Sequence, residues 1–131
     1  MVRSITILVA DDEELVLHFV ELVLHRAGYR VLAATDAAQA LRLCGDGAES
    51  IDLALLDLVM PVMNGRQLRD RLHAVYPNLP VLFMSGYGVG ELREQCGADA
   101  PAGELLKKPF TSTQLLHRVR EITERPRSQR A

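Results

Sequence analysis

Several apolar runs of this sequence end in side chains that could do chemistry. Asp11 and Asp12 follow the first run, and Asp57, Ser85 and Lys108 close three later ones. Aspartate is depleted in strands and is almost never fully buried without a partner, so an aspartate that ends an apolar run points to a function. Carboxylates about 4 Å apart repel each other by roughly 4 kcal/mol per pair at an effective dielectric near 20. Protons or a cation must therefore relieve the repulsion if the three aspartates meet.

The residue types at these ends favour a hard divalent cation and phosphoryl chemistry. Oxygen ligands beside one ammonium suit Mg²⁺ or Mn²⁺ better than Zn²⁺, since no Cys or His stands at these ends. A metal would keep Asp57 ionised and nucleophilic. Lys108 would place a positive charge on a phosphoryl oxygen, and Ser85 would donate a hydrogen bond to another. The combination predicts that Asp57 is a phosphoacceptor.

Each of these residues also has an ordinary structural explanation. Asp11 and Asp12 could cap the helix that follows them, because acidic residues stabilise a helix N-terminus. Ser85 could begin the turn into Gly86, and Lys108 could be an ordinary lysine on an edge strand. Their joint occurrence at the ends of these runs favours the functional interpretation.

The elements that must position these side chains alternate between strand and helix. Strands are predicted over residues 5–10, 30–34, 51–57, 80–85 and 103–108. Helices are predicted over about 13–27, 36–44, 64–75, 89–96 and 111–122. Asp36, Asn64 and Thr111 are the expected caps of three of these helices. Such alternation implies an α/β domain with a parallel sheet, and the nearly continuous apolar strands indicate helices on both faces.

A flavodoxin-like, doubly wound sheet of five parallel strands in the order 2-1-3-4-5 fits this length best. In open parallel sheets the ligand site lies at the carboxyl ends of the strands, near the switch in strand order. The order puts the first, third and fourth strands side by side, with the fifth at the edge. The fold therefore predicts that the carboxylates, the hydroxyl and the ammonium share one crevice.

Length and composition bound the domain organisation. The 131 residues suit one domain at 1–124, followed by a basic tail or linker at 125–131. Hydrophobic residues make up 48% and charged residues 24%, and no apolar run approaches the ~20 residues of a membrane-spanning helix. The first residues lack the layout of a signal peptide, and the two distant cysteines fit reduced thiols, so a cytoplasmic location is expected. The net charge of −2 does not indicate binding to nucleic acid or to a membrane surface.

Over about residues 5–124 the sequence resembles the receiver domain of two-component response regulators, whose fold is the CheY-like form of the flavodoxin-like sheet. The resemblance is carried by Asp11-Asp12, by Asp57 with Met60, Pro61 and Gly65, by Ser85, and by Lys108-Pro109-Phe110. The segments 84–88 and 105–110 look most like those of receivers in hybrid sensor histidine kinases, which is an analogy at the family level.

The resemblance implies a ligand set for Mg²⁺. In this family the residues matching Asp12 and Asp57 are direct ligands, and the one matching Asp11 acts largely through water. The backbone carbonyl at Val59 completes the protein's share. The bond before the proline that matches Pro109 is often cis, which would help to aim the preceding lysine.

Three further positions bear on the expected switch and on the lifetime of the aspartyl phosphate. Many receivers carry an aromatic switch residue where this sequence has Leu105, so a switch of the usual kind is not expected here. Tyr87 and Val59 occupy the two positions that flank the attacking water in the family. A bulky ring and an apolar side chain there are expected to slow hydrolysis of the aspartyl phosphate.

The implied function is phosphorylation-controlled signalling rather than an enzyme activity, with the domain assisting its own phosphorylation and dephosphorylation. A histidine kinase or a histidine phosphotransfer protein would be the donor, and a kinase linked covalently in a longer protein is one form of that partnership. Phosphorylation would then change the face formed by the fourth helix, the fifth strand and the last helix, a face that forms homodimers in some relatives.

Other functions compete with this one. The main alternative is a degenerate receiver that acts as a phosphorylation-independent docking module. A phosphatase of the haloacid dehalogenase type would need a second acid at Val59, and a nucleotide or flavin module would need another glycine spacing than Gly86, Gly88 and Gly90 provide.

Overall fold

The computed structural model describes residues 4–45, 50–86 and 104–125 of the chain. Within these ranges it contains five strands: β1 (Thr6–Ala10), β2 (Arg30–Ala34), β3 (Leu53–Asp57), β4 (Val81–Ser85) and β5 (Leu105–Lys107). All neighbouring pairs are parallel, and the strand order is β2-β1-β3-β4-β5. The predicted doubly wound sheet is confirmed.

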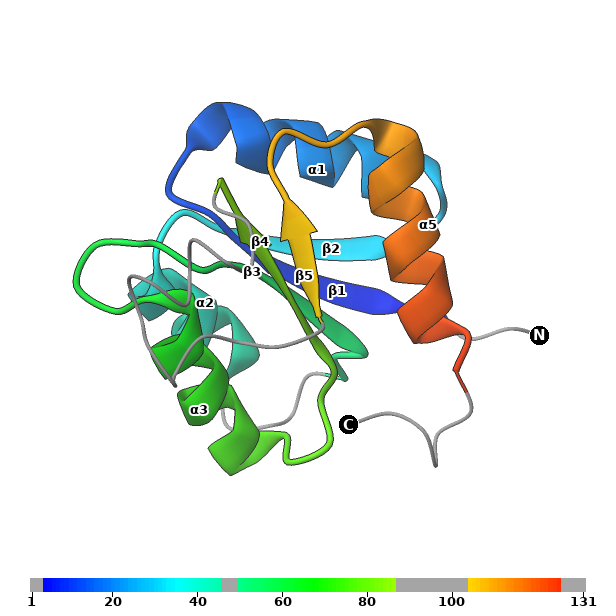
Figure 1. The fold of residues 1–131 in the computed structure, drawn as a ribbon. Coiled ribbons are helices and arrows are strands. Elements are labelled where there is room, and N and C mark those ends of the chain that lie inside the picture. Colours follow the sequence, from blue (N-terminus) through cyan, green and yellow to red (C-terminus); the bar gives the residue numbers. More distant parts are fainter. Residues whose placement is uncertain (1–3, 46–49, 87–103, 126–131) are drawn as a thin grey trace.

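Helices cover both faces of the sheet (Figure 1). The helices in the described ranges are α1 (Glu14–Arg26), α2 (Ala37–Cys44), α3 (Gly65–Val75) and α5 (Ser112–Thr123). Figure 1 shows α1 and α5 on one face and α2 and α3 on the other. The helix predicted near 89–96, Tyr87, Cys96 and residues 126–131 of the predicted tail lie outside the described residues. No helix in the described ranges is both long and apolar enough to cross a membrane.

Three helices begin at the caps that the sequence predicts. The side chain of Asp36 accepts a hydrogen bond from the backbone N–H of Gln39 at 2.7 Å. Asn64 and Thr111 each form a full capping box with the glutamine three residues later. Each box satisfies backbone groups that would otherwise lack partners, and this fixes where the helix starts.

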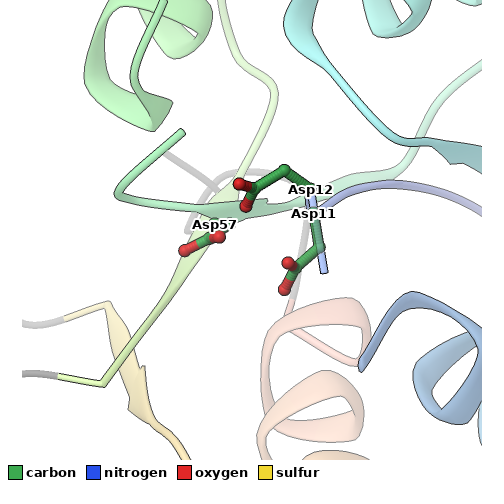
Figure 2. Close-up of side chains that lie close together, drawn as sticks. All are labelled: Asp11, Asp12 and Asp57. Atoms are coloured by element: carbon green, nitrogen blue, oxygen red, sulfur yellow. The ribbon is translucent and has the colours of Figure 1, made fainter. Parts of the chain in front are cut away.

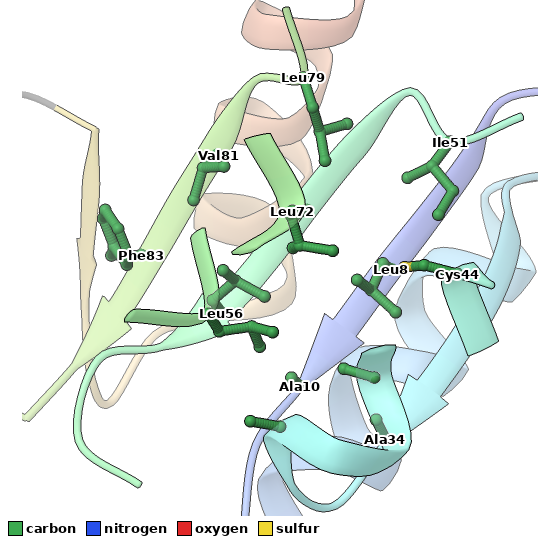
Figure 3. Close-up of a cluster of buried hydrophobic side chains, with 14 of the residues drawn as sticks. Leu8, Ala10, Ala34, Cys44, Ile51, Leu56, Leu72, Leu79, Val81 and Phe83 are labelled. Carbon is green, nitrogen blue, oxygen red and sulfur yellow. The ribbon is translucent and has the colours of Figure 1, made fainter. Parts of the chain in front are cut away.

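Alternation along the strands divides the core into two clusters. One set of strand side chains packs under α2 and α3, and Figure 3 shows Leu8, Leu56 and Phe83 in this layer with Cys44 and Leu72 from the helices. The alternate set, which includes Ile7, Leu55 and Met84, packs against buried residues of α1 and α5. Because successive side chains point to opposite faces, a strand covered on both sides must be apolar throughout. This explains the unbroken runs in the sequence.

The third and fifth strands are shorter than expected, since β5 covers Leu105–Lys107 rather than 103–108. The third strand begins at Leu53 rather than at residue 51, and just before it the Asp52 side chain accepts a 2.9 Å hydrogen bond from the backbone N–H of Thr6. On α1, the side chain of Phe19 is 40% exposed. Its ring lies 6.3 Å from that of Phe110, so it packs beside the segment that leads into α5.

Candidate functional site

The carboxyl ends of the strands bring the predicted residues together. Asp11 follows β1, Asp57 ends β3 and Ser85 ends β4, while Lys108 comes directly after β5. The backbone N–H of Lys108 donates to the carbonyl of Ser85 at 2.6 Å, which continues the pairing of β5 with β4. Ser85 is 1% exposed and therefore belongs to the buried end of the sheet.

The three aspartates form one cluster, and Figure 2 shows their side chains gathered beyond the ends of β1 and β3. Asp11, Asp12 and Asp57 each offer a carboxylate oxygen, and these oxygens all lie within 4.8 Å of one another. Asp11 is 0% exposed and Asp57 is 4% exposed, whereas Asp12 is exposed. The cluster therefore has two buried carboxylates and one that is open to solvent.

Lys108 supplies the positive charge of the cluster. Its Nζ lies 2.8 Å from Asp11 Oδ2, 3.1 Å from Glu13 Oε1 and 3.5 Å from Asp57 Oδ2. The Lys108 side chain is only 12% exposed, so these contacts are poorly screened by water. The peptide bond between Lys108 and Pro109 is cis, as predicted.

Burial and charge shift the pKa values of the two central groups. Burial, followed by the negative charge of Asp11, raises the pKa of Asp57 from 3.8 to about 7, although Lys108 acts in the opposite direction. Burial disfavours the charged form of Lys108, but its contacts with Asp11, Asp57 and Glu13 outweigh this and raise its pKa. Without a metal, Asp57 therefore holds its negative charge at a cost, while the ammonium of Lys108 stays protonated.

The residues present fit a hard divalent cation. Asp11 Oδ2 is buried, and among the described residues no donor satisfies it in hydrogen-bonding geometry, although Lys108 Nζ is its counter-charge at 2.8 Å. Asp12 and Asp57 add further carboxylate oxygens within 4.8 Å. An oxygen-only set with this negative charge suits Mg²⁺ or Mn²⁺.

The loop after β3 holds the backbone of Asp57 in place. The N–H of Leu58 donates to the carbonyl of Met84 at 2.8 Å, and the carbonyl of Leu58 accepts from the N–H of Gly65 at 3.0 Å. A Cβ at Gly65 would lie 2.5 Å from the carbonyl oxygen of Asp57, so only glycine allows the start of α3 to approach this closely. Within the same loop Val62 has a φ of 70°, which is unusual for a β-branched residue.

An open cleft of about 840 Å³ leads to the cluster. Asp12, Asp57 and Lys108 line its polar part, while Leu15 and Phe19 contribute to its apolar part along α1. Asp57 is therefore reachable from solvent through a cleft with a polar and an apolar part.

Comparison with known proteins identifies the family to which this site belongs. A family model described as the response regulator receiver domain matches residues 7–120. The chain belongs to the response regulator receiver domain family.

Individual relatives include kinases and regulators. The chain is 33% identical over 122 residues to the sensor kinase CckA of Brucella abortus (strain 2308), covering 93% of this chain and 13% of that protein. It is 39% identical over 119 residues to the transcriptional regulatory protein CpxR of Escherichia coli (strain K12), covering 91% of this chain and 49% of that protein. The chain thus spans half or less of the length of these relatives.

A solved structure agrees in fold and in type of receiver. The crystal structure of the receiver domain from the hybrid histidine kinase CckA matches with a TM-score of 0.73 and 31% identity, covering 88% of this chain and 96% of that one. Relatives of this receiver domain thus include a receiver of a hybrid kinase, as the sequence motifs indicated, and the domain is part of two-component signalling.

The structure also locates three of the four positions that were predicted to modulate the site. Val59 is 56% exposed at the cleft, and its N–H lies 3.3 Å from Asp57 Oδ1. Leu105 is partly buried and packs against the core cluster under α2 and α3. Pro109 lines the cleft, while Tyr87 lies outside the described residues. The effects predicted for Val59, Tyr87 and Leu105 stay predictions.

Sequence reasoning missed Glu13 as a residue that shapes this receiver site. Glu13 contacts Lys108 across 95 positions of sequence, and its backbone N–H donates to Asp11 Oδ1 at 2.8 Å. The available signal was the third acid of the turn that begins with Asp11 and Asp12. Gly65 was noted as part of a motif, but its close approach to the Asp57 carbonyl appears only in three dimensions.

Proposed function

We propose that this receiver domain accepts a phosphoryl group on Asp57 from a histidine kinase or a histidine phosphotransfer protein, in a reaction that depends on Mg²⁺ or Mn²⁺. One observation carries the proposal: Asp57 lies at an open cleft within 4.8 Å of the other two aspartates and 3.5 Å from the ammonium of Lys108. This arrangement combines a nucleophile, a metal-binding set and a fixed positive charge.

In the proposed transfer, an ionised oxygen of Asp57 attacks the phosphorus of a phosphohistidine. The new P–O bond forms as the P–N bond breaks, and the electron pair leaves with the imidazole nitrogen, which ends protonated by solvent. Lys108 turns from its carboxylate contacts toward a phosphoryl oxygen, and the hydroxyl of Ser85 donates a hydrogen bond to another. These groups stabilise the charge that the transferred group carries.

The metal site of the proposal consists of Asp11, Asp12, Asp57 and the backbone carbonyl of Val59. A divalent cation held there supplies positive charge that offsets the clustered carboxylates and the phosphoryl oxygens. Its positive charge would also oppose the burial and the negative charge of Asp11 that raise the pKa of Asp57, and so favour an ionised carboxyl when the donor arrives.

The same groups are proposed to assist hydrolysis of the aspartyl phosphate by water. The domain would then help to set how long it stays phosphorylated. Val59, which is exposed at the cleft, is proposed to slow that step together with Tyr87. The response is proposed to pass through β5 and α5, where Leu105 changes its packing. The donor is proposed to be a separate protein or a kinase within one longer polypeptide, and a homodimer through this face is compatible with either.

Intact-mass spectrometry after incubation with acetyl phosphate tests the proposal. We expect one phosphoryl adduct on the wild-type protein, formed with Mg²⁺ and not with a chelator, and none on Asp57→Asn. Asp52→Asn is the matched control, since it makes the same change at the other buried aspartate next to β3, and its adduct is expected to form normally.

The result that contradicts the proposal is a folded protein that binds Mg²⁺ and gains no phosphoryl group. That outcome favours the docking module, in which the same surface acts without phosphorylation. An adduct that persists in Asp57→Asn would instead move the acceptor to another residue.

A further inference from the structure

Glu13 contacts the same ammonium as the two buried aspartates, but from a different environment. Glu13 Oε1 lies 3.1 Å from Lys108 Nζ, between the distances of 2.8 Å to Asp11 and 3.5 Å to Asp57. The side chain of Glu13 is 63% exposed, whereas those of Asp11 and Asp57 are 0% and 6% exposed. The ammonium therefore lies at a boundary, with two acceptors inside the site and one at its mouth.

Metal binding at the aspartates changes the position that the ammonium prefers. Asp11 and Asp57 are both metal-ligand candidates and both partners of Lys108. A divalent cation that takes their oxygens neutralises these partners and repels the ammonium. Lys108 then needs another acceptor close by, and moving toward solvent lowers the desolvation that burial imposes on its charge.

Glu13 meets these requirements without a change in the backbone. Its carboxylate already contacts Lys108, and its N–H is held by Asp11 Oδ1 at 2.8 Å, which anchors the residue beside the cluster. Its side chain also lines the cleft through which the phosphoryl group is proposed to enter. When the ammonium of Lys108 contacts Glu13, a movement of the lysine side chain alone can therefore bring it to the entering phosphoryl group.

We propose that Glu13 is a positioning residue for Lys108, holding the ammonium when a divalent cation occupies the carboxylates of Asp11 and Asp57. The inference rests on the metal binding that the proposed function requires. It adds a step to that function: Lys108 moves from the aspartates to Glu13 when the metal binds, and from Glu13 to the phosphoryl group when the donor arrives.

A double-mutant cycle on Mg²⁺ affinity tests this role. Mg²⁺ is titrated at constant ionic strength, and binding is followed by backbone amide NMR shifts in the wild type, Glu13→Gln, Lys108→Met and the double variant. Glu14→Gln, alone and with Lys108→Met, is the matched control, because Glu14 is the adjacent exposed acid and the change in charge is the same. Circular dichroism establishes that each variant is folded.

We expect Glu13→Gln to weaken Mg²⁺ binding by about two- to fivefold, the range for an ion pair with one exposed member. Glu14→Gln should weaken it less than twofold, because it removes charge but no contact. In the Lys108→Met background the two glutamine substitutions should have equal, small effects, since there is no ammonium to hold. This non-additivity between positions 13 and 108 is the signature of the proposed contact.

Additive effects of Glu13→Gln and Lys108→Met overturn the inference, and so does an equal loss for Glu13→Gln and Glu14→Gln in the wild-type background. The phosphorylation assay separates this result from the proposed function. Coupling in Mg²⁺ binding without a phosphoryl adduct supports the role of Glu13 and rejects phosphoacceptance. An adduct without coupling does the reverse.

Discussion

Two buried aspartates lie at opposite ends of β3, and their side chains contact different kinds of group. Asp52, 7% exposed, precedes the strand, and its carboxylate accepts the backbone N–H of Thr6 at 2.9 Å. Asp57, 4% exposed, ends the strand, where it faces another buried carboxylate and its nearest ammonium lies 3.5 Å away. Burial alone therefore does not mark a functional carboxylate.

What distinguishes the two aspartates is the kind of group that each carboxylate faces. The side chain of Asp52 accepts a hydrogen bond from the first residue of β1, so it helps to join two strands. The environment of Asp57 adds a like charge from Asp11, and its pKa rises to about 7. The first aspartate stabilises the fold, while the second leaves a charge unbalanced for a ligand to balance.

The largest expected effect is a gain in stability when the charge at Asp57 is removed. At pH 8 without metal, Asp57→Asn should raise the free energy of unfolding by up to about 4 kcal/mol. This figure follows from the pKa difference between 3.8 and about 7 at 1.36 kcal/mol per pKa unit. Urea unfolding of both proteins measures it.

The sign of the pH dependence follows from the same shift. The folded state keeps a proton on Asp57 up to about pH 7, whereas the unfolded state loses it near pH 3.8, so the folded state binds more protons between these values. Stability relative to Asp57→Asn should therefore fall as the pH rises from about 4 to 7 and level off above. Mg²⁺ should restore stability to the wild type at pH 8 and not to Asp57→Asn. A flat difference across this range would contradict the assignment.

A somewhat smaller effect, this time a loss of stability, is expected when Gly65 is changed to alanine. The added Cβ would lie 2.5 Å from the Asp57 carbonyl oxygen, so backbone must move, at a cost of about 3 kcal/mol. The movement should also slow phosphorylation by acetyl phosphate. Gly86→Ala is the control, because a Cβ there meets nothing within 4 Å, and its midpoint of urea unfolding should barely change.

Removal of the other aspartate should act on stability alone. Asp52→Ala leaves the buried N–H of Thr6 without this acceptor, which should lower the free energy of unfolding by about 2 kcal/mol. Asp52→Asn keeps an acceptor oxygen and should lose less. Both variants should bind Mg²⁺ as the wild type does, and a loss of Mg²⁺ affinity would end the distinction between the two aspartates.

The smallest expected effect lies in the loop between β3 and α3. Val62 is fully exposed at a φ of 70°, a conformation that L-residues reach at a cost and glycine does not. Val62→Gly should therefore stabilise the domain by about 0.5–1 kcal/mol after the added chain entropy. Val62→Ala should fall between the two, and thermal unfolding can rank all three.

Local patterns in the sequence were enough for most of the architecture. The caps at Asp36, Asn64 and Thr111 and the uniformly apolar strands predicted helix starts and strand order, because each depends on neighbouring residues or on general rules of topology. The strand ends then placed Asp57 and Lys108 in one crevice, as the structure confirms.

What the sequence did not contain depends on contacts between distant segments. The pairing of Glu13 with Lys108 joins two loops, and nothing in either loop specifies the distance between them. The role of Asp52 needs the register of β1 beside β3, and the exposure of Phe19 needs the position of α5. At Val62 the local preference of a β-branched residue points away from the observed φ, so tertiary constraints prevail there.

Leu58, the residue after Asp57, connects two neighbouring elements through its backbone. Leu58 donates its N–H to the carbonyl of Met84 and its own carbonyl accepts the N–H of Gly65, so one residue joins the end of β4 to the first turn of α3. Any tilt of the Asp57 backbone must lengthen one of these bonds or carry both elements along. Deuterium uptake at the amides of Leu58 and Gly65 therefore reports on the backbone at Asp57, without any label on its side chain.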